Sequence, residues 1–209
     1  MRAQARAMNF PRPSILILAA GASSRMRGAD KMLEIVDGVP QIRRITKAAL
    51  ATGCPVTVTL PPDRPARAAA LAGLAATQVN VANASAGMAA SIHAGLEALP
   101  PEGAVLIVLA DLPELTAADL GTILAAQAAT PDLIIRACSA SGVPGHPVGF
   151  PPWARPDLAA LTGDAGARDL LARHASRSRC VALPGSHAVT DLDTPEAWAA
   201  WRARRGRGD

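Results

Sequence analysis

The sequence is poor in aromatic residues. Phenylalanine, tryptophan and tyrosine together make up 2% of the 209 residues, and tyrosine is absent. So few aromatic rings leave almost no platform on which nucleic-acid bases could stack. The net charge of +4 would otherwise suggest a nucleic-acid partner. Much of that positive charge lies near the two ends of the chain, so we expect no nucleic-acid binding.

Cysteine and long apolar segments are also scarce. The three cysteines, Cys54, Cys138 and Cys180, are odd in number and far apart, which excludes a disulfide framework and a zinc ribbon. Such usage favours a reducing, cytoplasmic location. No apolar run approaches the roughly 20 residues of a membrane span. The sequence therefore predicts a cytoplasmic protein with no membrane partner, and residues 1–13 lack the apolar segment of a signal peptide.

What the chain does contain is an alternation of strand and helix patterns. Half of its residues are apolar, which is enough for one sizeable core. The alternation predicts an α/β fold, a three-layer α/β/α Rossmann-like arrangement with a mostly parallel sheet. We expect a disordered extension over 1–13, a single domain over 14–204 and a basic tail over 205–209. The expected strands are 14–20, 55–60, 78–82, 104–111, 132–138, 146–150 and 180–184, and the expected helices lie near 40–52, 64–75, 88–98, 116–128, 166–174 and 194–204.

Two polar segments follow the strands that we expect at the centre of the sheet. Strands 14–20 and 104–111 are apolar throughout, as is typical of buried neighbours in a parallel sheet. Ligands of such sheets bind beyond the carboxyl ends of the strands. A glycine turn that carries Lys31 follows the first strand, and Asp111 ends the second. The two segments therefore predict one ligand crevice.

The turn after the first strand, LAAGASSRMRGADK, suits an anion. Ala19, Ala20 and Gly21 have no bulk to keep a ligand from the backbone, and Gly21 is free to take a positive φ. Arg25 could pair with two phosphate oxygens, and Lys31 could neutralise another. Only two lysines stand beside 19 arginines, and a compact ammonium fits against a phosphate where a guanidinium would not. The spacing is neither a Walker A loop nor a dinucleotide turn, and an ordinary turn with solvated cations would have the same composition.

This turn resembles the signature of the MobA-like nucleotidyltransferases, Leu-Ala-Ala/Gly-Gly-x-Ser-x-Arg-Met-Gly followed by Lys. The resemblance extends from about residue 15 to about residue 198. It implies that the turn wraps a nucleoside triphosphate, with Arg25 and Lys31 on the phosphates. Leu18, Ala19, Ala20 and Gly21 would then lie beside the nucleotide.

The turn departs from that signature at one position and points to one branch of the family at another. Arg27 stands where the family usually has Gly, so that Gly28 would serve in a loop one residue longer. Ala20 before Gly21 is similar to the cytidylyltransferase branch that acts on molybdopterin, whereas the guanylyl branch typically has Gly there. The resemblance therefore implies CTP as the substrate.

Two acidic motifs, VLADLPELT and TDLDTPEAW, are candidates for a metal site. Asp111 ends an expected strand, where a carboxylate could bind Mg²⁺ together with phosphates, and Thr116 is a better cap for the next helix. Asp193 or Thr194 could cap the last helix, so capping alone would also explain Asp193. The motifs resemble the family's Asp-Met-Pro and Asp-x-Asp-Thr-Pro segments. This implies that Asp111 and Asp193 hold Mg²⁺, with Asp191 in support.

The segment NASAGMAASIHAGL leads into an expected helix. A glycine and a hydroxyl at a helix N-terminus could receive an anion or the edge of a base. The segment resembles the family's Gly-Met/Leu-x-x-Ser motif near the base and ribose. We therefore expect Asn83, Gly87 and Ser91 to contact the nucleotide.

Two further segments resemble the acceptor side of the family. The Pro- and Gly-rich stretch 142–156 predicts an inserted hairpin or a lid. His146 within it would contact a phosphate or a pterin, although a lone histidine in a Gly- and Pro-rich loop is more often structural. The segment at 163–166 is expected to be a turn that leads into a helix, from which Arg168 could reach the phosphate of the acceptor.

The resemblance implies Mg²⁺-dependent nucleotidyl transfer from CTP to the terminal phosphate of molybdopterin, with release of pyrophosphate. Arg25, Lys31 and Asp111 are the implied catalytic residues. Guanylyl transfer, cytidylyl transfer to methylerythritol phosphate and activation of a sugar phosphate use the same scaffold. Hexose-1-phosphate enzymes, however, carry Pro-Lys where this chain has Asp30-Lys31. A non-catalytic alternative is a nucleotide-binding partner of a molybdenum enzyme or its chaperone.

Overall fold

A mostly parallel sheet forms the centre of the computed structural model, which describes residues 12–163 and 167–206. Residues 1–11 of the predicted extension, 164–166 of the predicted turn and 207–209 of the predicted tail lie outside the described residues. The large sheet has seven strands in the order β5-β4-β1-β6-β8-β7-β9. Only β8 runs antiparallel to its neighbours. The strands are β1 (Ser14–Leu18), β2 (Ile35–Val36), β3 (Val39–Pro40), β4 (Val56–Leu60), β5 (Thr77–Asn80), β6 (Val105–Leu109), β7 (Ile134–Cys138), β8 (Pro144–Phe150) and β9 (Ser178–Ala182).

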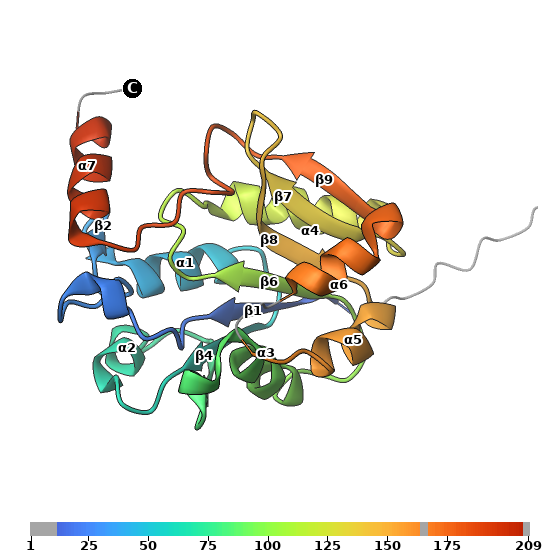
Figure 1. Ribbon diagram of the computed structural model, residues 1–209, viewed down its shortest axis with the longest axis horizontal. Helices are drawn as coiled ribbons and strands as arrows, with labels where there is room; N and C mark the ends of the chain where they lie inside the picture. Colours follow the sequence, from blue (N-terminus) through green and yellow to red (C-terminus); the bar gives the residue numbers. More distant parts are fainter. Residues whose placement is uncertain (1–11, 164–166, 207–209) are drawn as a thin grey trace, which may run out of the picture.

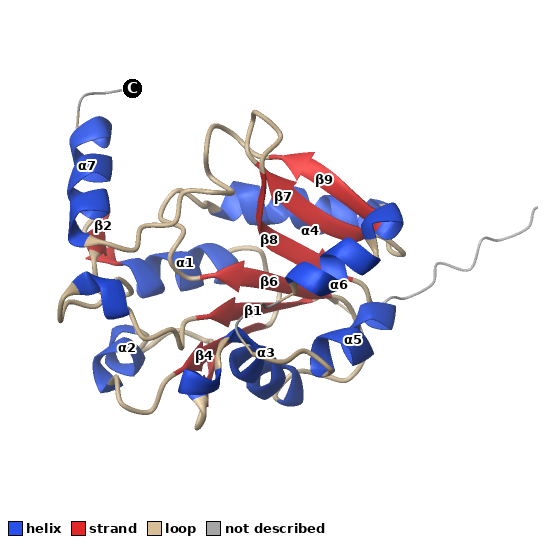
Figure 2. Ribbon diagram, viewed as in Figure 1, coloured by secondary structure: helices blue, strands red, loops and turns tan. Residues whose placement is uncertain are grey.

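Helices cover both faces of this sheet (Figures 1 and 2). Side chains of α1, α2 and α4 pack on one face, and side chains of α3, α5 and α6 pack on the other. The predicted three-layer α/β/α arrangement is therefore confirmed. The helices are α1 (Gln41–Leu50), α2 (Pro65–Ala70), α3 (Met88–Glu97), α4 (Ala117–Ala129), α5 (Arg155–Ala159), α6 (Arg168–Arg173) and α7 (Pro195–Arg205).

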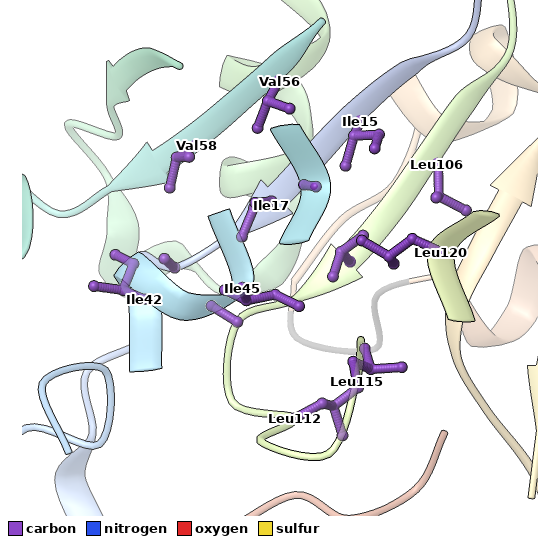
Figure 3. Close-up of a cluster of buried hydrophobic side chains, with 14 of the residues drawn as sticks. Ile15, Ile17, Ile42, Ile45, Val56, Val58, Leu106, Leu112, Leu115 and Leu120 are labelled. Atoms are coloured by element: carbon purple, nitrogen blue, oxygen red, sulfur yellow. The ribbon is translucent and has the colours of Figure 1, made fainter. Parts of the chain in front are cut away.

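The central strand β1 contributes to both layers of the core. Successive side chains of a strand point to opposite faces, so Ile15 and Ile17 enter one cluster while Leu16 and Leu18 enter the other. Figure 3 shows Ile17 beside Ile45 of α1, and Ile15 further along β1 between Val56 and Leu106. As predicted, β1 and β6 are neighbours in parallel register, and this places their carboxyl ends side by side.

Most predicted elements are present, and the differences lie chiefly at their ends. Helix α2 is shorter than expected, because it ends at Ala70 and a turn at the positive-φ Gly73 follows. The β2–β3 hairpin and α5 were not predicted, since elements of two to five residues are too short for a hydrophobic period to identify.

The predicted strand 146–150 lies within β8, which pairs antiparallel with β7 and so forms a hairpin with it, and the stretch 142–156 is not a lid. Strand β8 lies inside the sheet between β6 and β7. Its glycines serve close packing rather than turning, because a Cβ at Gly145 would meet the carbonyl of Ala188. A Cβ at Gly149 would likewise lie 2.5 Å from Oε1 of Gln127. These two glycines give the stretch the composition of a loop, although both lie within a strand.

Helix α7 lies beside β2, on the side toward which the arrowheads of β1 and β6 point (Figure 1). Its buried Trp198 and Trp201 form a separate cluster with Met26, Val36 and Leu192. The predicted tail begins inside this helix, because α7 runs to Arg205. None of the described helices is long and apolar enough to cross a membrane.

Replacement by alanine should have opposite effects on stability at two glycines that lie within helices. Gly95→Ala in α3 would press its Cβ against the fully buried Leu16 and should cost about 1–3 kcal/mol of stability. Gly121→Ala in α4 has no neighbouring atom within 4 Å and should add about 0.5–1 kcal/mol. Denaturant unfolding of both variants checks this, and an equal gain at both positions would contradict the packing of α3 on β1.

Candidate functional site

A turn between β1 and α1 borders a cavity at the carboxyl edge of the sheet. Gly21 is free to take a positive φ but does not do so. Ser23 at 53°, Arg27 at 51° and Gly28 at 94° adopt positive φ instead, on either side of the 3-10 helix η1 (Ser24–Met26). A Cβ at Gly21 would meet no atom within 4 Å, because this residue faces the open cavity.

Sequence reasoning missed the residue that holds this turn from behind. Arg67 of α2 is 0% exposed and contacts both ends of the turn. Its Nη1 donates to the carbonyls of Ala19 at 2.6 Å and Gly21 at 2.8 Å. Its Nε and Nη2 donate to the two carboxylate oxygens of Asp30, at 2.7 and 2.9 Å. An arginine on a short helix has the sequence signature of a solvated cation, so no pattern pointed to it.

The ammonium group of Lys31 joins two predicted aspartates from distant segments of the chain. Lys31 Nζ donates to Asp111 Oδ2 at 2.6 Å and to Asp193 Oδ1 at 2.8 Å. Arg25 reaches the other oxygen of Asp193 at 2.5 Å. The Lys31 side chain is only 12% exposed and the two aspartates are 15% and 17% exposed. The cluster is therefore largely shielded from solvent, where charge pairs interact more strongly than on a surface.

The capping explanation for Asp193 does not hold. Thr194 is the N-cap of α7 and its hydroxyl accepts from Ala197 N at 3.2 Å. Trp198 Nε1 donates to the carbonyl of Leu192 at 3.1 Å, which fixes the residue before Asp193. Asp193 is thus held at the start of the helix with its carboxylate turned to the charged cluster.

Likewise, Asp111 does not cap α4. Thr116 caps that helix, and its hydroxyl and the carboxylate of Asp119 form a reciprocal capping box, as the sequence predicted for Thr116. The Oδ1 atom of Asp111 is buried and accepts no hydrogen bond from the part of the chain that the structure describes. A buried carboxylate oxygen without a partner is costly unless a ligand completes it.

Charges in the cluster shift the pKa values of Lys31 and Asp191. Burial would lower the pKa of the Lys31 ammonium, but Asp111 and Asp193 outweigh it and hold that pKa above its ordinary value of 10.5. Burial raises the pKa of the Asp191 carboxyl above 3.8, and repulsion from Asp193 and Asp111 adds to it. The carboxylates therefore crowd one another, and a cation between them relieves the repulsion.

A divalent cation fits this set of donors. Asp111 offers an unpartnered oxygen, and Asp193 lies close enough to Asp191 to raise the pKa of the Asp191 carboxyl. No group of three His, Cys, Asp or Glu side chains among the described residues could bind a metal by itself. This agrees with Mg²⁺ chemistry, in which one or two carboxylates act together with phosphates and water.

The cavity beside the cluster has a volume of about 440 Å³. Most of the predicted nucleotide-binding residues line it, and Ala19, Arg25 and Asn83 do not. Ala19 is buried behind the turn, and Asn83 is exposed. The predicted residues in the lining are Leu18, Ala20, Gly21, Lys31, Gly87, Ser91 and Asp111, and the additional ones are Ala22, Ser24, Met32, Ala84, Ser85, Met88 and Leu109.

The predicted acceptor residues lie apart from this lining. His146 is the third residue of β8 and is near enough to Asp111 and Arg136 to feel their charges. Burial, helped by Arg136, lowers the pKa of His146 to about 4, so its imidazole is neutral at neutral pH. Arg168 is exposed at the first residue of α6.

Comparison with known proteins identifies relatives of the chain. A family model described as MobA-like NTP transferase domain matches residues 15–178. No curated protein matches the chain by sequence. Rv0371c from Mycobacterium tuberculosis H37Rv is similar over 92% of this chain and 98% of its own, with 27% identity and a TM-score of 0.81. A complex of that protein with manganese covers 91% of this chain and 97% of its own, with 26% identity and a TM-score of 0.74.

More distant structures share the fold. Mth528, a nucleotidyl transferase from Methanothermobacter thermautotroptrophicus, covers 95% of this chain and 99% of its own, at 21% identity and a TM-score of 0.76. Molybdopterin-guanine dinucleotide biosynthesis protein A from Archaeoglobus fulgidus covers 93% and 99%, at 14% identity and a TM-score of 0.61. These likenesses confirm the predicted Rossmann-like α/β fold.

The Asp30–Arg67 pair predicts an acid-sensitive contribution to stability. Burial would raise the pKa of Asp30, but Arg67 outweighs it and holds that pKa below 3.8. A carboxyl with a lowered pKa stabilises the folded chain above the pKa of the unfolded chain, and the contribution is lost as the pH falls through the folded value. Asp30→Asn should therefore cost about 1–3 kcal/mol near neutral pH, and less as the pH falls below 3.8.

Urea unfolding across this pH range measures the effect. Asp63→Asn is the control, because Asp63 is exposed a few residues before Arg67 and its replacement should change stability little. A cost for Asp30→Asn that stays constant into strong acid would show that the ion pair is not its source.

Proposed function

The chain belongs to the MobA-like NTP transferase family, and from this premise we propose that it transfers a cytidylyl group from CTP to the terminal phosphate of molybdopterin. The observation that carries the proposal is the convergence of Lys31, Asp111 and Asp193 beside the cavity. These residues are far apart in the sequence. The expected sheet predicted one crevice for Lys31 and Asp111, and the resemblance added Asp193. We also propose that the chain forms one cytoplasmic domain over 14–204.

The triphosphate would lie against the turn after β1. Ala20, Gly21 and Ala22 line the cavity with small side chains, so phosphates can approach the backbone N–H groups. Lys31 stays ionised because of its raised pKa, and Arg25 is 68% exposed and able to turn from Asp193 to a phosphate. Two cations would thus neutralise the pyrophosphate as it leaves.

Asp111 and Asp193 would hold a divalent cation, which we propose to be Mg²⁺. When bound, such an ion withdraws charge from the phosphate oxygens and favours departure of pyrophosphate. The binding of manganese by Rv0371c supports a divalent metal in this family. In this chain, Lys31 would exchange its contacts with the two carboxylates for contacts with phosphate.

The reaction needs positioning more than proton transfer. The attacking oxygen of a phosphate monoester is already ionised, so no general base is required. The attacking oxygen forms a bond to the α-phosphorus of CTP while the bond to pyrophosphate breaks. The turn and the charged cluster would align the reacting phosphates and neutralise their negative charges.

The choice of CTP rests on the turn, and the choice of acceptor rests on the family. Ala20 lines both the main cavity and an adjoining cavity of about 250 Å³, where it would lie beside the base. His146 and Arg168 would contact the acceptor. A neutral His146 would donate a hydrogen bond to the pterin or a phosphate rather than contribute charge.

Replacement of Lys31 tests the proposed chemistry. Lys31→Ala should lower the rate of pyrophosphate release from CTP and molybdopterin at least about 100-fold, because a cation at the leaving group is lost. Lys47→Ala is the matched control, since Lys47 is the other lysine and is exposed on α1. Turnover of Lys31→Ala at the wild-type rate would exclude this role.

Binding of the four triphosphates tests the base. With Mg²⁺ and nucleotide at roughly 100 times the Kd, CTP should raise the unfolding midpoint by about 5–10 °C. GTP, ATP and UTP at the same concentration should raise it less. A larger shift with GTP would favour guanylyl transfer, and equal shifts with all four would show that the cavity does not select cytosine.

A further inference from the structure

Arg67 makes a complete set of contacts with the turn. A guanidinium has five N–H donors, and each of the five has an acceptor here. Besides the bonds to Asp30 and to two carbonyls, Nη2 donates to Ser23 Oγ at 3.0 Å. Because Arg67 is 0% exposed, it cannot touch a ligand in the cavity. We infer that Arg67 is a positioning residue, which aims the backbone N–H groups of Ala20 and Ala22 at the triphosphate.

The planarity of the peptide bond provides the link. In a trans peptide, the C=O of one residue and the N–H of the next point in opposite directions. Arg67 draws the carbonyls of Ala19 and Gly21 toward the interior. The N–H groups of Ala20 and Ala22 therefore point away from Arg67, on residues that line the cavity. No hydrogen bond within the described part of the chain uses either N–H group.

Contacts at the far end of the turn keep this arrangement in place. Ser23 adopts a left-handed conformation that costs about 1 kcal/mol or more for a residue with a side chain. Its hydroxyl is held between Arg67 and Asp30, and Asp30 Oδ1 also accepts from Met32 N at 3.0 Å. One guanidinium thus fixes the start, middle and end of the turn at once.

Stability alone is a poor explanation for a buried arginine. A buried ion pair contributes little compared with apolar residues of the same size, because both charges lose their hydration. What Arg67 provides instead is a fixed backbone conformation. Backbone donors that are already oriented need no reorganisation when a phosphate binds. This inference rests on the proposed function, since it assumes that the cavity takes a triphosphate.

Phosphate affinity measured on folded variants tests the role of Arg67. The probes are inorganic tripolyphosphate and CTP, each with Mg²⁺, titrated by calorimetry into the full-length protein. Arg67→Met should weaken binding of both probes by about tenfold or more, because two donors lose their orientation. Arg67→Lys should weaken it similarly, because one ammonium cannot reach two carbonyls, a hydroxyl and a carboxylate together.

Arg43→Gln is the matched structural control. Arg43 holds α2 from its other end by donating to the carbonyls of Ala70 and Ala72, at 2.8 and 2.9 Å, and does not contact the turn. This variant should lose thermal stability and still bind both probes within about twofold of wild type. A tenfold loss in Arg43→Gln as well would mean that any destabilisation of α2 has the same effect, and would overturn the inference.

The remaining outcomes separate the two proposals. If Arg67→Met fails to fold, the affinity of Arg67→Lys for the two probes tests the role of Arg67, because this variant keeps a cation beside Asp30. Wild-type affinity in folded Arg67→Lys or Arg67→Met overturns the role of Arg67 and leaves the proposed function standing. Wild-type protein that binds neither CTP nor tripolyphosphate overturns the proposed function itself, and the inference with it.

Discussion

The candidate site depends on a single ammonium group. Lys31 joins the turn after β1, the end of β6 and the residues before α7, by bonds to Asp111 and Asp193. Removing this charge would leave two shielded carboxylates facing each other, with Asp191 nearby. Parallel pairing of β1 with β6 makes the contact possible, because it brings the two carboxyl ends to the same place. The sheet therefore provides position, and the lysine provides the charge balance.

The turn that carries Lys31 is supported on two sides. Trp198 and Trp201 of α7 bury Met26 of the turn in an apolar cluster. Arg67 of α2 holds the carbonyls and Asp30 by hydrogen bonds. A glycine turn without such supports would have to be ordered by its ligand, at a cost in affinity. Here the surrounding helices contribute that order in advance.

Patterns of residues predicted the parts of this arrangement that depend on short-range rules. The apolar runs of β1 and β6 identified neighbouring central strands, and Thr116 was identified as a cap from its spacing alone. The expected sheet predicted one crevice for the Lys31 turn and Asp111, whereas the part of Asp193 followed from a resemblance to a family, since no local rule connects it to them.

The sequence was misleading where tertiary packing decides. The glycines of β8 are required by close neighbours and not by a turn, so the composition around the correctly predicted strand 146–150 suggested a lid that is not there. Arg67 was missed because nothing in its local pattern distinguishes a buried arginine from a surface one. Gly21 had the freedom to take a positive φ, yet Ser23 takes it instead, with its hydroxyl bonded to Arg67.

Amide chemical shifts of the ¹⁵N-labelled protein test most directly whether a nucleotide binds at this edge. On addition of CTP and Mg²⁺, the amides of Ala20, Ala22 and Gly87 should shift. Those of Gly103 and Ala128, which line a cavity of about 460 Å³ at the opposite edge, should not. Shifts confined to the opposite cavity, with the turn after β1 unaffected, would contradict the assignment of this site.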